Sequence, residues 1–409
     1  MSNGVSVREV RAAALLRREF ALLDLREEAE FALGHPLFAA QVPLDRLELE
    51  APVRIPRRDT EIVLYGDDVE QGRETLLALG YSRVSSLNGG LAAWRDVGFE
   101  LFQDVNSYSK AFGELVEARR HTPSLPAPEV AALLEAKADV VVVDARRYEE
   151  YATMSIPTGT SVPGAELVLR VPALAPDANT TVIVNCAGRT RSIIGAQSLI
   201  NAGLPNRVVA LRNGTIGWKL AEQALDHGQR RRAPEVPSQA IAEACRRARD
   251  VAYRAGVRHI GASELALLAE DTTRTLYLFD VRTPEEFEAS PTPGFRNAQG
   301  GQLVQETDFF APVRGARIVL SDPLGARAEM TASWLAQMSW EVYVLEGTPD
   351  TRTAKRDSTP LPTRSGKGRY RRPYEGTDSA ASAMRAYLDW EFGLVEQLKR
   401  DGTHGFYVI

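Results

Sequence analysis

Short apolar runs alternate with stretches of helical period along most of this chain, and the plan occurs three times. Each repeat opens on an apolar strand that ends in Asp-x-Arg, at residues 24–26, 144–146 and 280–282. The later elements are a strand at 62–64, 182–184 and 318–320, a helix at 73–79, 192–202 and 328–338, and a strand at 84–87, 208–211 and 342–345. Short apolar strands that alternate with helices predict a parallel α/β sheet with right-handed crossovers.

The spacing inside the repeats is constant. The residue two positions past the second strand follows the opening aspartate by the same 42 positions in every repeat, and it is Gly66, Cys186 and Asp322 in turn. Chance does not give three equal spacings, so we interpret the chain as a tandem array of one domain type. In sheets of this class, ligands bind at the carboxyl ends of the strands, where these residues fall.

Proline-rich stretches divide the array. The segments at residues 121–128 (HTPSLPAP) and 230–237 (RRRAPEVP) separate the repeats, and an Ala- and Arg-rich helix is expected at 238–255. We predict doubly wound α/β domains over residues 1–120, 121–236 and 259–350, a bridging helix over 237–258, and an extended segment with a C-terminal helix over 351–409. Asp378 or Ser379 is expected to cap this last helix, which should end near Gly402 and dock onto one of the domains.

The composition narrows the range of partners. Hydrophobic residues make up 44% of the chain and charged residues 25%, with a net charge of −5, so neither a nucleic acid nor an anionic membrane surface is an expected partner. No apolar run approaches the roughly 20 residues that span a bilayer, and residues 1–16 lack the continuous apolar segment of a secretory signal. We therefore expect a cytoplasmic protein.

Two cysteines and five histidines limit the chemistry further. Cys186 and Cys245 supply no disulfide framework, and the histidines show no Cys/His spacing of a zinc site, so no metal or other cofactor is expected. Cys245 falls in the expected bridging helix, where an ordinary helix residue is favoured over a resolving or relay cysteine.

The candidate nucleophile is Cys186, which follows a buried strand and heads a short polar loop into a helix. The rest of the loop is Ala187, Gly188, Arg189, Thr190, Arg191 and Ser192. Its backbone N–H groups, the N-terminus of the following helix and the two arginines all favour negative charge on the sulfur. We therefore predict an exposed thiolate of low pKa, against the alternative of a small buried hydrophobe.

Two loop residues have candidate roles of their own. Arg191 is favoured over Arg189 for binding an anionic substrate, because its distance from Cys186 is the one that the loop geometry requires. Ser192 is expected to cap the helix, to donate a hydrogen bond to the substrate, or both.

These motifs resemble those of the rhodanese family, in a multi-repeat form. The similar segments are Asp144-Ala145-Arg146 with Tyr148, Glu150 and Tyr151, then Ile156-Pro157, Val162-Pro163, the Cys186 loop, and the closing Gly90-x-x-x-Trp94 and Gly214-x-x-x-Trp218. The first repeat has Gly34-His35, as the family often does, where the second has Met154-Ser155. The resemblance covers about residues 8 to 350.

The resemblance implies a sulfurtransferase with a two-step cycle. A donor such as thiosulfate would give its outer sulfur to the Cys186 thiolate and release sulfite. The Cys186 persulfide, held by the loop N–H groups, would pass the sulfur to cyanide in an assay or to a thiol in the cell. Asp144 and Arg146 are interpreted as structural residues near the site. The expected partners are a small-molecule sulfur donor and a thiol acceptor, with an acceptor protein as a further candidate.

The first and third repeats are predicted to be inactive. Gly66 and Asp322 stand where the second repeat has Cys186, so neither offers a nucleophilic sulfur. Arg327 matches Arg191 in position and is expected to pair with Asp322.

Two other functions stay open. With two inactive repeats, the chain is alternatively a non-enzymatic sulfur carrier or scaffold with a dedicated protein partner. A Cys-dependent phosphatase or arsenate reductase is the weaker hypothesis. Those enzymes place an arginine six residues after the cysteine, whereas Arg191 is five after Cys186, and the shorter loop suits a single sulfur better than a phosphoryl group.

Overall fold

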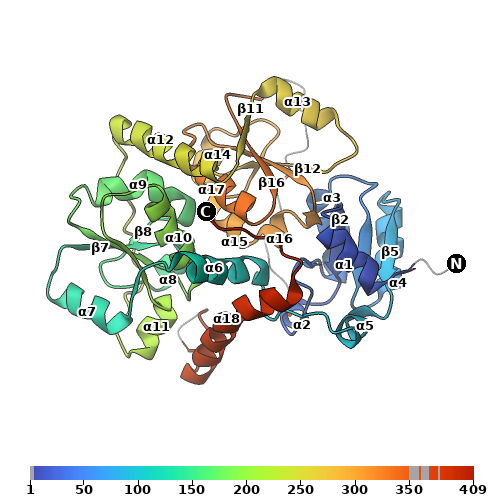
Figure 1. The fold of residues 1–409 in the computed structure, drawn as a ribbon, viewed down its shortest axis with the longest axis horizontal. Coiled ribbons are helices and arrows are strands. Elements are labelled where there is room, and N and C mark those ends of the chain that lie inside the picture. Colours follow the sequence, from blue (N-terminus) through green and yellow to red (C-terminus); the bar gives the residue numbers. More distant parts are fainter. Residues whose placement is uncertain (1–3, 350–358, 361–367, 376–377) are drawn as a thin grey trace.

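The computed structural model of the chain describes residues 4–349, 359–360, 368–375 and 378–409, and these contain three largely parallel β-sheets. Each sheet belongs mainly to one repeat; in Figure 1 the first repeat is at the right, the second at the left and the third above and between them. Helices cover the faces of the sheets. The predicted fold class, three tandem doubly wound α/β domains followed by a helical tail, is confirmed. The residue limits assigned to the domains stay predictions.

The first sheet has the strand order β1-β5-β4-β2, with β3 and β14 also paired to β2. Its strands are β1 (Gly4–Val5), β2 (Phe20–Asp24), β3 (Ala40–Gln41), β4 (Ile62–Tyr65), β5 (Val84–Leu87) and β14 (Val313–Arg314). Its helices are α1 (Val7–Leu15), α2 (Glu28–Phe31), α3 (Leu47–Arg54), α4 (Val69–Ala78) and α5 (Gly90–Asp96). β14 comes from the third repeat and runs antiparallel to β2, a pairing that the sequence pattern does not predict.

The second sheet has the order β6-β10-β9-β7-β8, with every pairing parallel. Its strands are β6 (Ser124–Leu125), β7 (Val140–Asp144), β8 (Thr160–Ser161), β9 (Thr181–Asn185) and β10 (Val208–Leu211). Its helices are α7 (Ala127–Glu135), α8 (Tyr148–Thr153), α9 (Leu167–Leu174), α10 (Thr190–Asn201) and α11 (Gly214–Leu220). In the register of β7 and β9, Asp144 lies opposite Asn185, so the first strand of the repeat ends beside Cys186.

The third sheet repeats this order as β11-β16-β15-β12-β13. Its strands are β11 (Arg258–Ile260), β12 (Leu276–Asp280), β13 (Arg296–Asn297), β15 (Arg317–Ser321) and β16 (Glu341–Leu345). Its helices are α13 (Ala262–Glu270), α14 (Pro284–Ala289), α15 (Gly300–Gln305), α16 (Thr307–Phe310) and α17 (Ala326–Gln337). The third sheet thus has the same strand order as the second.

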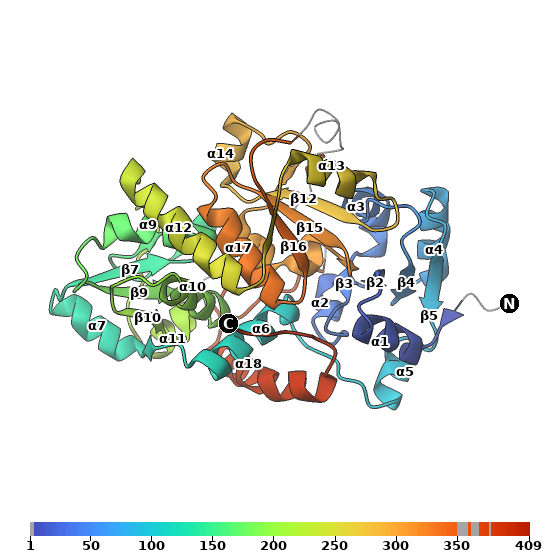
Figure 2. The same cartoon turned by 45° about the horizontal axis from the view of Figure 1, so that its top comes forward.

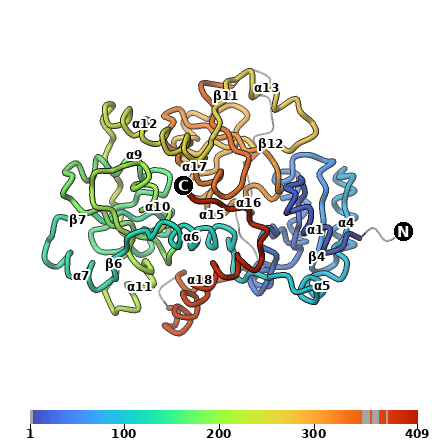
Figure 3. Tube along the Cα trace, in the orientation of Figure 1, coloured from blue at the N-terminus to red at the C-terminus, as the bar shows by residue number. Residues whose placement is uncertain are grey.

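Three longer helices lie outside the sheets: α6 (Ser107–Arg120) and α12 (Ser238–Arg254) connect successive repeats, and α18 (Ala381–Asp401) follows the third. α12 packs on α9 and α17, and α6 packs on both α10 and α18. Figure 2 shows α6 crossing the middle of the molecule with α18 beside it. Figure 3 follows the chain beyond α18 back to the centre, where the Tyr407 N–H donates to the Gln337 carbonyl oxygen at 3.0 Å.

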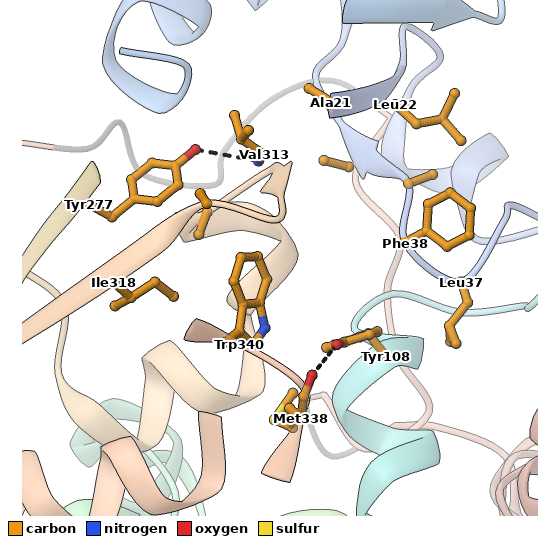
Figure 4. Close-up of a cluster of buried hydrophobic side chains, with 14 of the residues drawn as sticks. Ala21, Leu22, Leu37, Phe38, Tyr108, Tyr277, Val313, Ile318, Met338 and Trp340 are labelled. Atoms are coloured by element: carbon orange, nitrogen blue, oxygen red, sulfur yellow. Dashed lines mark hydrogen bonds between the residues drawn. The ribbon is translucent and has the colours of Figure 1, made fainter. Parts of the chain in front are cut away.

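The first and third repeats share one hydrophobic cluster, which also includes side chains of α6. Figure 4 shows Trp340 and Ile318 of the third repeat facing the first sheet. The Tyr108 hydroxyl of α6 donates to the Met338 carbonyl oxygen at the edge of this cluster. The second repeat builds further clusters around its own sheet. Among the described residues, no helix is both long and apolar enough to cross a membrane.

The bounds of the strands agree with the sequence predictions more closely than the start of the last helix does. Strands predicted at 84–87 and 208–211 are β5 and β10, residue for residue. Neither Asp378 nor Ser379 caps the last helix, because α18 begins at Ala381 and Ala380 is its N-cap residue. α18 ends as predicted, at a left-handed Gly402 with φ of 66°. The extended segment predicted after residue 350 lies largely outside the described residues.

Candidate active site

The Cys186 loop joins β9 to α10 at the carboxyl edge of the second sheet, as predicted. The start of α11 fixes its position, because the Cys186 carbonyl accepts from the Thr215 N–H at 2.9 Å and from Thr215 Oγ1 at 3.1 Å. Gly214 makes this approach possible. Its φ is 51°, and a Cβ there would lie 2.3 Å from the Cys186 oxygen. The glycine of the closing Gly-x-x-x-Trp motif is therefore required by the loop itself.

The Cys186 thiol is buried, with 2% of the residue exposed. Its Sγ donates to Ser192 Oγ at 3.4 Å, and Ser192 Oγ donates to the Arg189 carbonyl oxygen at 2.8 Å. Burial raises the pKa of Cys186, against the opposing effects of the Arg191 charge and the Ser192 hydrogen bonds. The prediction of an exposed thiolate of low pKa is therefore wrong for this conformation, in which the thiol form is favoured.

Arg191 is held by a carboxylate from α8. Glu150 accepts two hydrogen bonds from the Arg191 guanidinium, at 2.7 and 2.8 Å. Burial opposes the charge of Glu150, but the paired Arg191 outweighs burial and holds the Glu150 pKa well below its usual range. The third repeat has the same pair, Glu286 with Arg327. Glu150 thus orients Arg191, and the identical offset of Glu286 from its Asp-x-Arg motif is the sequence signal for this role.

The Arg189 side chain forms its hydrogen bonds with α6 and not with the Cys186 sulfur. Its guanidinium bonds to both carboxylate oxygens of Glu114 on α6 at 2.8 Å, and it also pairs with Glu117. The Phe392 ring of α18 packs against it, with the guanidinium carbon 4.1 Å from the ring centroid. Arg189 therefore ties the loop to α6 and α18, which leaves Arg191 as the better placed of the two arginines.

The other loop residues make packing contacts and backbone hydrogen bonds. The Ala187 carbonyl accepts from the Ile216 N–H at 2.9 Å, and the Thr190 side chain packs against Gly113 of α6. Ser192 does not cap α10, because the helix begins at Thr190 and Ser192 lies within its first turn. Its hydroxyl accepts from the Cys186 thiol instead. The capping role is therefore wrong, and a hydrogen bond from Ser192 to the substrate stays a prediction.

The C-terminal helix α18 covers the loop, which explains the burial of the sulfur. A Cβ built on Gly188 would lie 3.2 Å from Glu391 Oε2 and 3.3 Å from the Tyr387 ring. Phe392 extends the cover to Arg189. The prediction that this helix docks onto one of the domains is confirmed. The sequence does not predict that the helix covers the Cys186 loop. Amphipathic spacing shows that a helix is covered on one side and does not show what it covers.

A pocket of about 330 Å³ opens beside the loop, between α8, α15 and the segment before α18. Arg191 and Glu150 form one wall, and Tyr374 lies on the side of the C-terminal segment. The third repeat contributes Gln302 and Gln305. The third repeat thus helps to build the surroundings of Arg191.

Asp144 and Arg146 form a buried pair below the loop. The Arg146 guanidinium donates to both Asp144 oxygens at 2.9 and 2.7 Å, and to the Met154 carbonyl at 2.6 Å. The amide of Asn185, at the end of β9, donates to Asp144, at the end of β7, at 2.8 Å. This network therefore joins the ends of the two strands. The other two Asp-x-Arg motifs form the same pair.

The first and third repeats fill the cysteine position in different ways. Gly66 has φ of 108°, and a Cβ there would lie 2.9 Å from the Arg26 side chain, so the site has no room for a nucleophile. Asp322 accepts from the Arg327 N–H at 2.9 Å and from its guanidinium at 3.0 Å, as the pairing prediction required. Its carboxylate thus occupies the anion position of its own loop.

Cys245 lies on α12, where its thiol donates to the Leu324 carbonyl oxygen of the third repeat at 2.7 Å. Both cysteines are free thiols. In the part of the chain that the structure describes, no three His, Cys, Asp or Glu side chains gather in a way that could hold a metal ion.

Comparison with known proteins places these features in a family. The rhodanese-like domain family matches residues 10–96 and 126–221. A solved structure of thiosulfate sulfurtransferase from Pseudomonas aeruginosa is 48% identical, covers 100% of both chains and has a TM-score of 0.94. The Alr3790 protein from Anabaena sp. is 26% identical over 25% of this chain and 83% of its own, with a TM-score of 0.23.

YnjE is 15% identical over 85% of this chain and 93% of its own, with a TM-score of 0.27. A search of curated proteins finds no match. The full-length Pseudomonas structure and the two domain matches are the informative similarities. Together with a cysteine that heads the strand–loop–helix connection of the second repeat, they show that this chain belongs to the rhodanese family.

Proposed function

We propose that the chain is a sulfurtransferase that moves sulfane sulfur through a persulfide on Cys186. The observation that carries the proposal is the position of Cys186 at the head of the loop into α10, with Ser192 on its sulfur and the Arg191 charge acting on it. The name of the full-length relative, thiosulfate sulfurtransferase, supports the same reaction.

In the first step, thiosulfate is the sulfur donor. The Cys186 thiolate attacks the outer sulfur of thiosulfate, the bond between its two sulfurs breaks, and sulfite leaves with the electron pair of that bond. Arg191 binds the donor anion from the pocket side, because its guanidinium keeps a full charge while Glu150 fixes its orientation. Loop N–H groups between Ala187 and Ser192 stabilise the persulfide anion.

The second step regenerates the thiolate. A thiolate acceptor attacks the outer sulfur of the Cys186 persulfide, and the Cys186 thiolate leaves. Asp144 and Arg146 position the loop through the network at the strand ends and do not react. The first and third repeats, with Gly66 and Asp322 at the cysteine position, act as support and carry no sulfur.

One observation favours a second candidate. The burial of Cys186 under α18 favours a sulfur carrier that holds its persulfide until a dedicated acceptor engages it. Rapid turnover of thiosulfate with cyanide would support the enzyme. A persulfide that persists with cyanide and is discharged by a single protein partner would support the carrier.

The test of sulfur transfer is the intact mass of the protein after incubation with thiosulfate. The wild type should gain about 32 Da, one sulfur, and lose it again with cyanide or dithiothreitol, whereas Cys186→Ser should gain nothing. Cys245→Ser is the matched control, since it removes the other free thiol and should gain the sulfur normally. No gain with any sulfane-sulfur donor would overturn the proposal.

A further inference from the structure

Glu391 of α18 has a buried carboxyl oxygen that no described residue hydrogen-bonds. Only 1% of the residue is exposed. Its Oε1 accepts the Tyr387 hydroxyl at 2.9 Å, but Oε2 has no hydrogen-bond partner among the described residues. A buried polar atom without a partner costs free energy, so its retention calls for a role that the resting structure does not satisfy.

The free oxygen faces the Cys186 loop. A Cβ built on Gly188 would lie 3.2 Å from Glu391 Oε2 and 3.8 Å from Oε1, so the carboxyl rests on the backbone two residues after the cysteine. The Glu391 charge also raises the pKa of the Cys186 thiol, which places the two groups in each other's field. Glu391 is therefore part of the inner surface of the cover over the loop.

Several charged groups set the protonation of Glu391. On its own helix it meets Tyr387, from α6 it faces Glu114 and Lys110, and from the loop it faces Arg189. Burial raises the pKa of Glu391 to about 8, the Glu114 charge adds to this, and the other three groups oppose it. Below that pH the carboxyl is mostly neutral, so Oε2 can carry a proton toward the loop.

We propose that Glu391 is a substrate-binding residue of the Cys186 site, which hydrogen-bonds the oxyanion end of the sulfur donor so that the donor binds together with one proton. This inference rests on the sulfur transfer proposed above. A neutral carboxylic acid donates to a dianion such as thiosulfate, whereas a carboxylate repels it in the same buried place. The donor supplies the missing partner of Oε2, and Arg191 supplies the full positive charge from the pocket side.

The test is thiosulfate binding to the full-length Cys186→Ala variant, measured by calorimetry at about pH 6.5 and about pH 9.5. This variant cannot turn over and has no thiol to titrate at the site, so the change in affinity reports the neighbouring groups. We expect the dissociation constant to rise at least about tenfold between the two pH values. Adding Glu391→Gln, which keeps an N–H donor and cannot ionise, should leave affinity at the two pH values equal within about twofold.

Two further variants sharpen the result. Glu396→Gln changes the same residue type on the exposed side of α18 and should keep the pH dependence of its Cys186→Ala parent. Tyr387→Phe removes a hydroxyl that favours the Glu391 carboxylate, so it should move the midpoint of the pH dependence upward. Melting curves check that each variant is folded.

The inference is overturned by equal affinity of the Cys186→Ala parent at both pH values, by no thiosulfate binding at either, or by a pH dependence that survives Glu391→Gln. The sulfur-mass experiment on wild type decides the proposed function separately. A wild type that gains sulfur while the calorimetry fails would remove Glu391 from the site and leave the transferase in place.

Discussion

Burial under α18 protects the thiol of Cys186, whereas the hydrogen bonds from Ser192 and the charge of Arg191 favour its thiolate. Because burial raises its pKa, the thiol is the main form at neutral pH, and the reactive thiolate appears only as the pH rises above the ordinary value near 9. Sulfur loading must therefore begin with loss of this proton or with an opening of the cover. Both routes make reactivity depend on pH and on the position of α18.

The first prediction concerns this pH dependence. In a Cys245→Ser background, alkylation of Cys186 by iodoacetamide at about pH 7.5 should be at least about tenfold slower than alkylation of an unfolded cysteine peptide. The rate should keep rising beyond pH 9, where the peptide rate has begun to level off. Mass spectrometry after timed quenching measures both rates. A plateau below about pH 8 would show that the thiolate is already stabilised in the resting protein.

The second prediction separates Arg191 from its copy in the third repeat. Arg191→Lys keeps the charge but loses the paired hydrogen bonds to Glu150, so kcat/KM for thiosulfate should fall about a hundredfold. Arg327→Lys breaks the equivalent pair with Glu286, where there is no sulfur, together with the pair to Glu166 that joins the two repeats, so kcat/KM should fall far less than for Arg191→Lys, by no more than about threefold. Each should lose about 2 kcal/mol of stability in chemical denaturation. An equal loss of activity in both would mean that Arg191 acts only through the fold.

At the scale of residues, the sequence predicts the candidate nucleophile and its loop better than it predicts the residues around them. Cys186 and Arg191 stand out because position and charge are local features of one segment. The role of Glu150 could have been predicted, because Glu286 of the third repeat lies at the same distance in sequence from its own Asp-x-Arg motif. The role of Glu391 could not, because it lies about 200 positions from the loop: its spacing from Leu388 and Leu394 places it on the buried face of α18 but does not show what that face covers. The burial of Cys186 was mispredicted for the same reason.

At the scale of elements, α11 and the Cys186 loop depend on each other. The third prediction compares Gly214→Ala with Gly90→Ala, two glycines with similar φ of 51° and 54° in equivalent positions. A methyl group at 214 would lie 2.3 Å from the Cys186 oxygen, whereas a methyl group at 90 meets nothing within 4 Å. Both changes carry about 1–2 kcal/mol of left-handed backbone strain.

Gly214→Ala should therefore cost at least about 3 kcal/mol and should also slow sulfur loading, because the loop must shift. Gly90→Ala should lose only the strain energy and load normally. Urea denaturation and the sulfur-mass assay measure the two effects. Equal stability and equal loading in the two variants would mean that the loop tolerates displacement.

The sequence predicts elements well where their signal is periodic. The strands β5 and β10 match the prediction because each is a short segment with apolar residues at both ends and polar residues on either side of it. The N-cap of α18 was predicted one or two residues early, because Asp378 and Ser379 are good capping residue types, whereas the N-cap residue is Ala380. β14 has no sequence signal, because an edge strand of two residues is defined by its partner Ala21 and not by its own pattern.

At the scale of the whole molecule, the third repeat supports the active loop from outside. Trp334 of α17 donates its indole N–H to Ser198 Oγ of α10 at 2.9 Å and packs edge-on to Phe112 of α6. The buried pair of Arg327 with Glu166 joins the same two repeats at 3.1 Å. The sequence predicts three similar domains but not this arrangement, because each contact joins residues from different repeats.

The fourth prediction tests this support with two buried tryptophans. Trp334→Ala should cost about 3–5 kcal/mol and should also change the rate of sulfur loading at Cys186, because α10 loses a hydrogen bond and a packing surface. Trp94→Ala is the matched control. Trp94 is equally buried in the first repeat, where its indole donates within that repeat to the Glu100 carbonyl at 3.0 Å, so the stability loss should be similar and loading unaffected in the folded protein.

Stopped incubations with thiosulfate followed by intact mass give the loading rates, and calorimetric melting gives the stabilities. Trp334→Phe adds a finer comparison, since it keeps most of the apolar surface and removes only the N–H that reaches Ser198. A loading rate that changes with Trp334→Ala but not with Trp94→Ala would make the third repeat a functional part of the sulfur site. Equal loading rates in both alanine variants would reduce the third repeat to a stabilising neighbour.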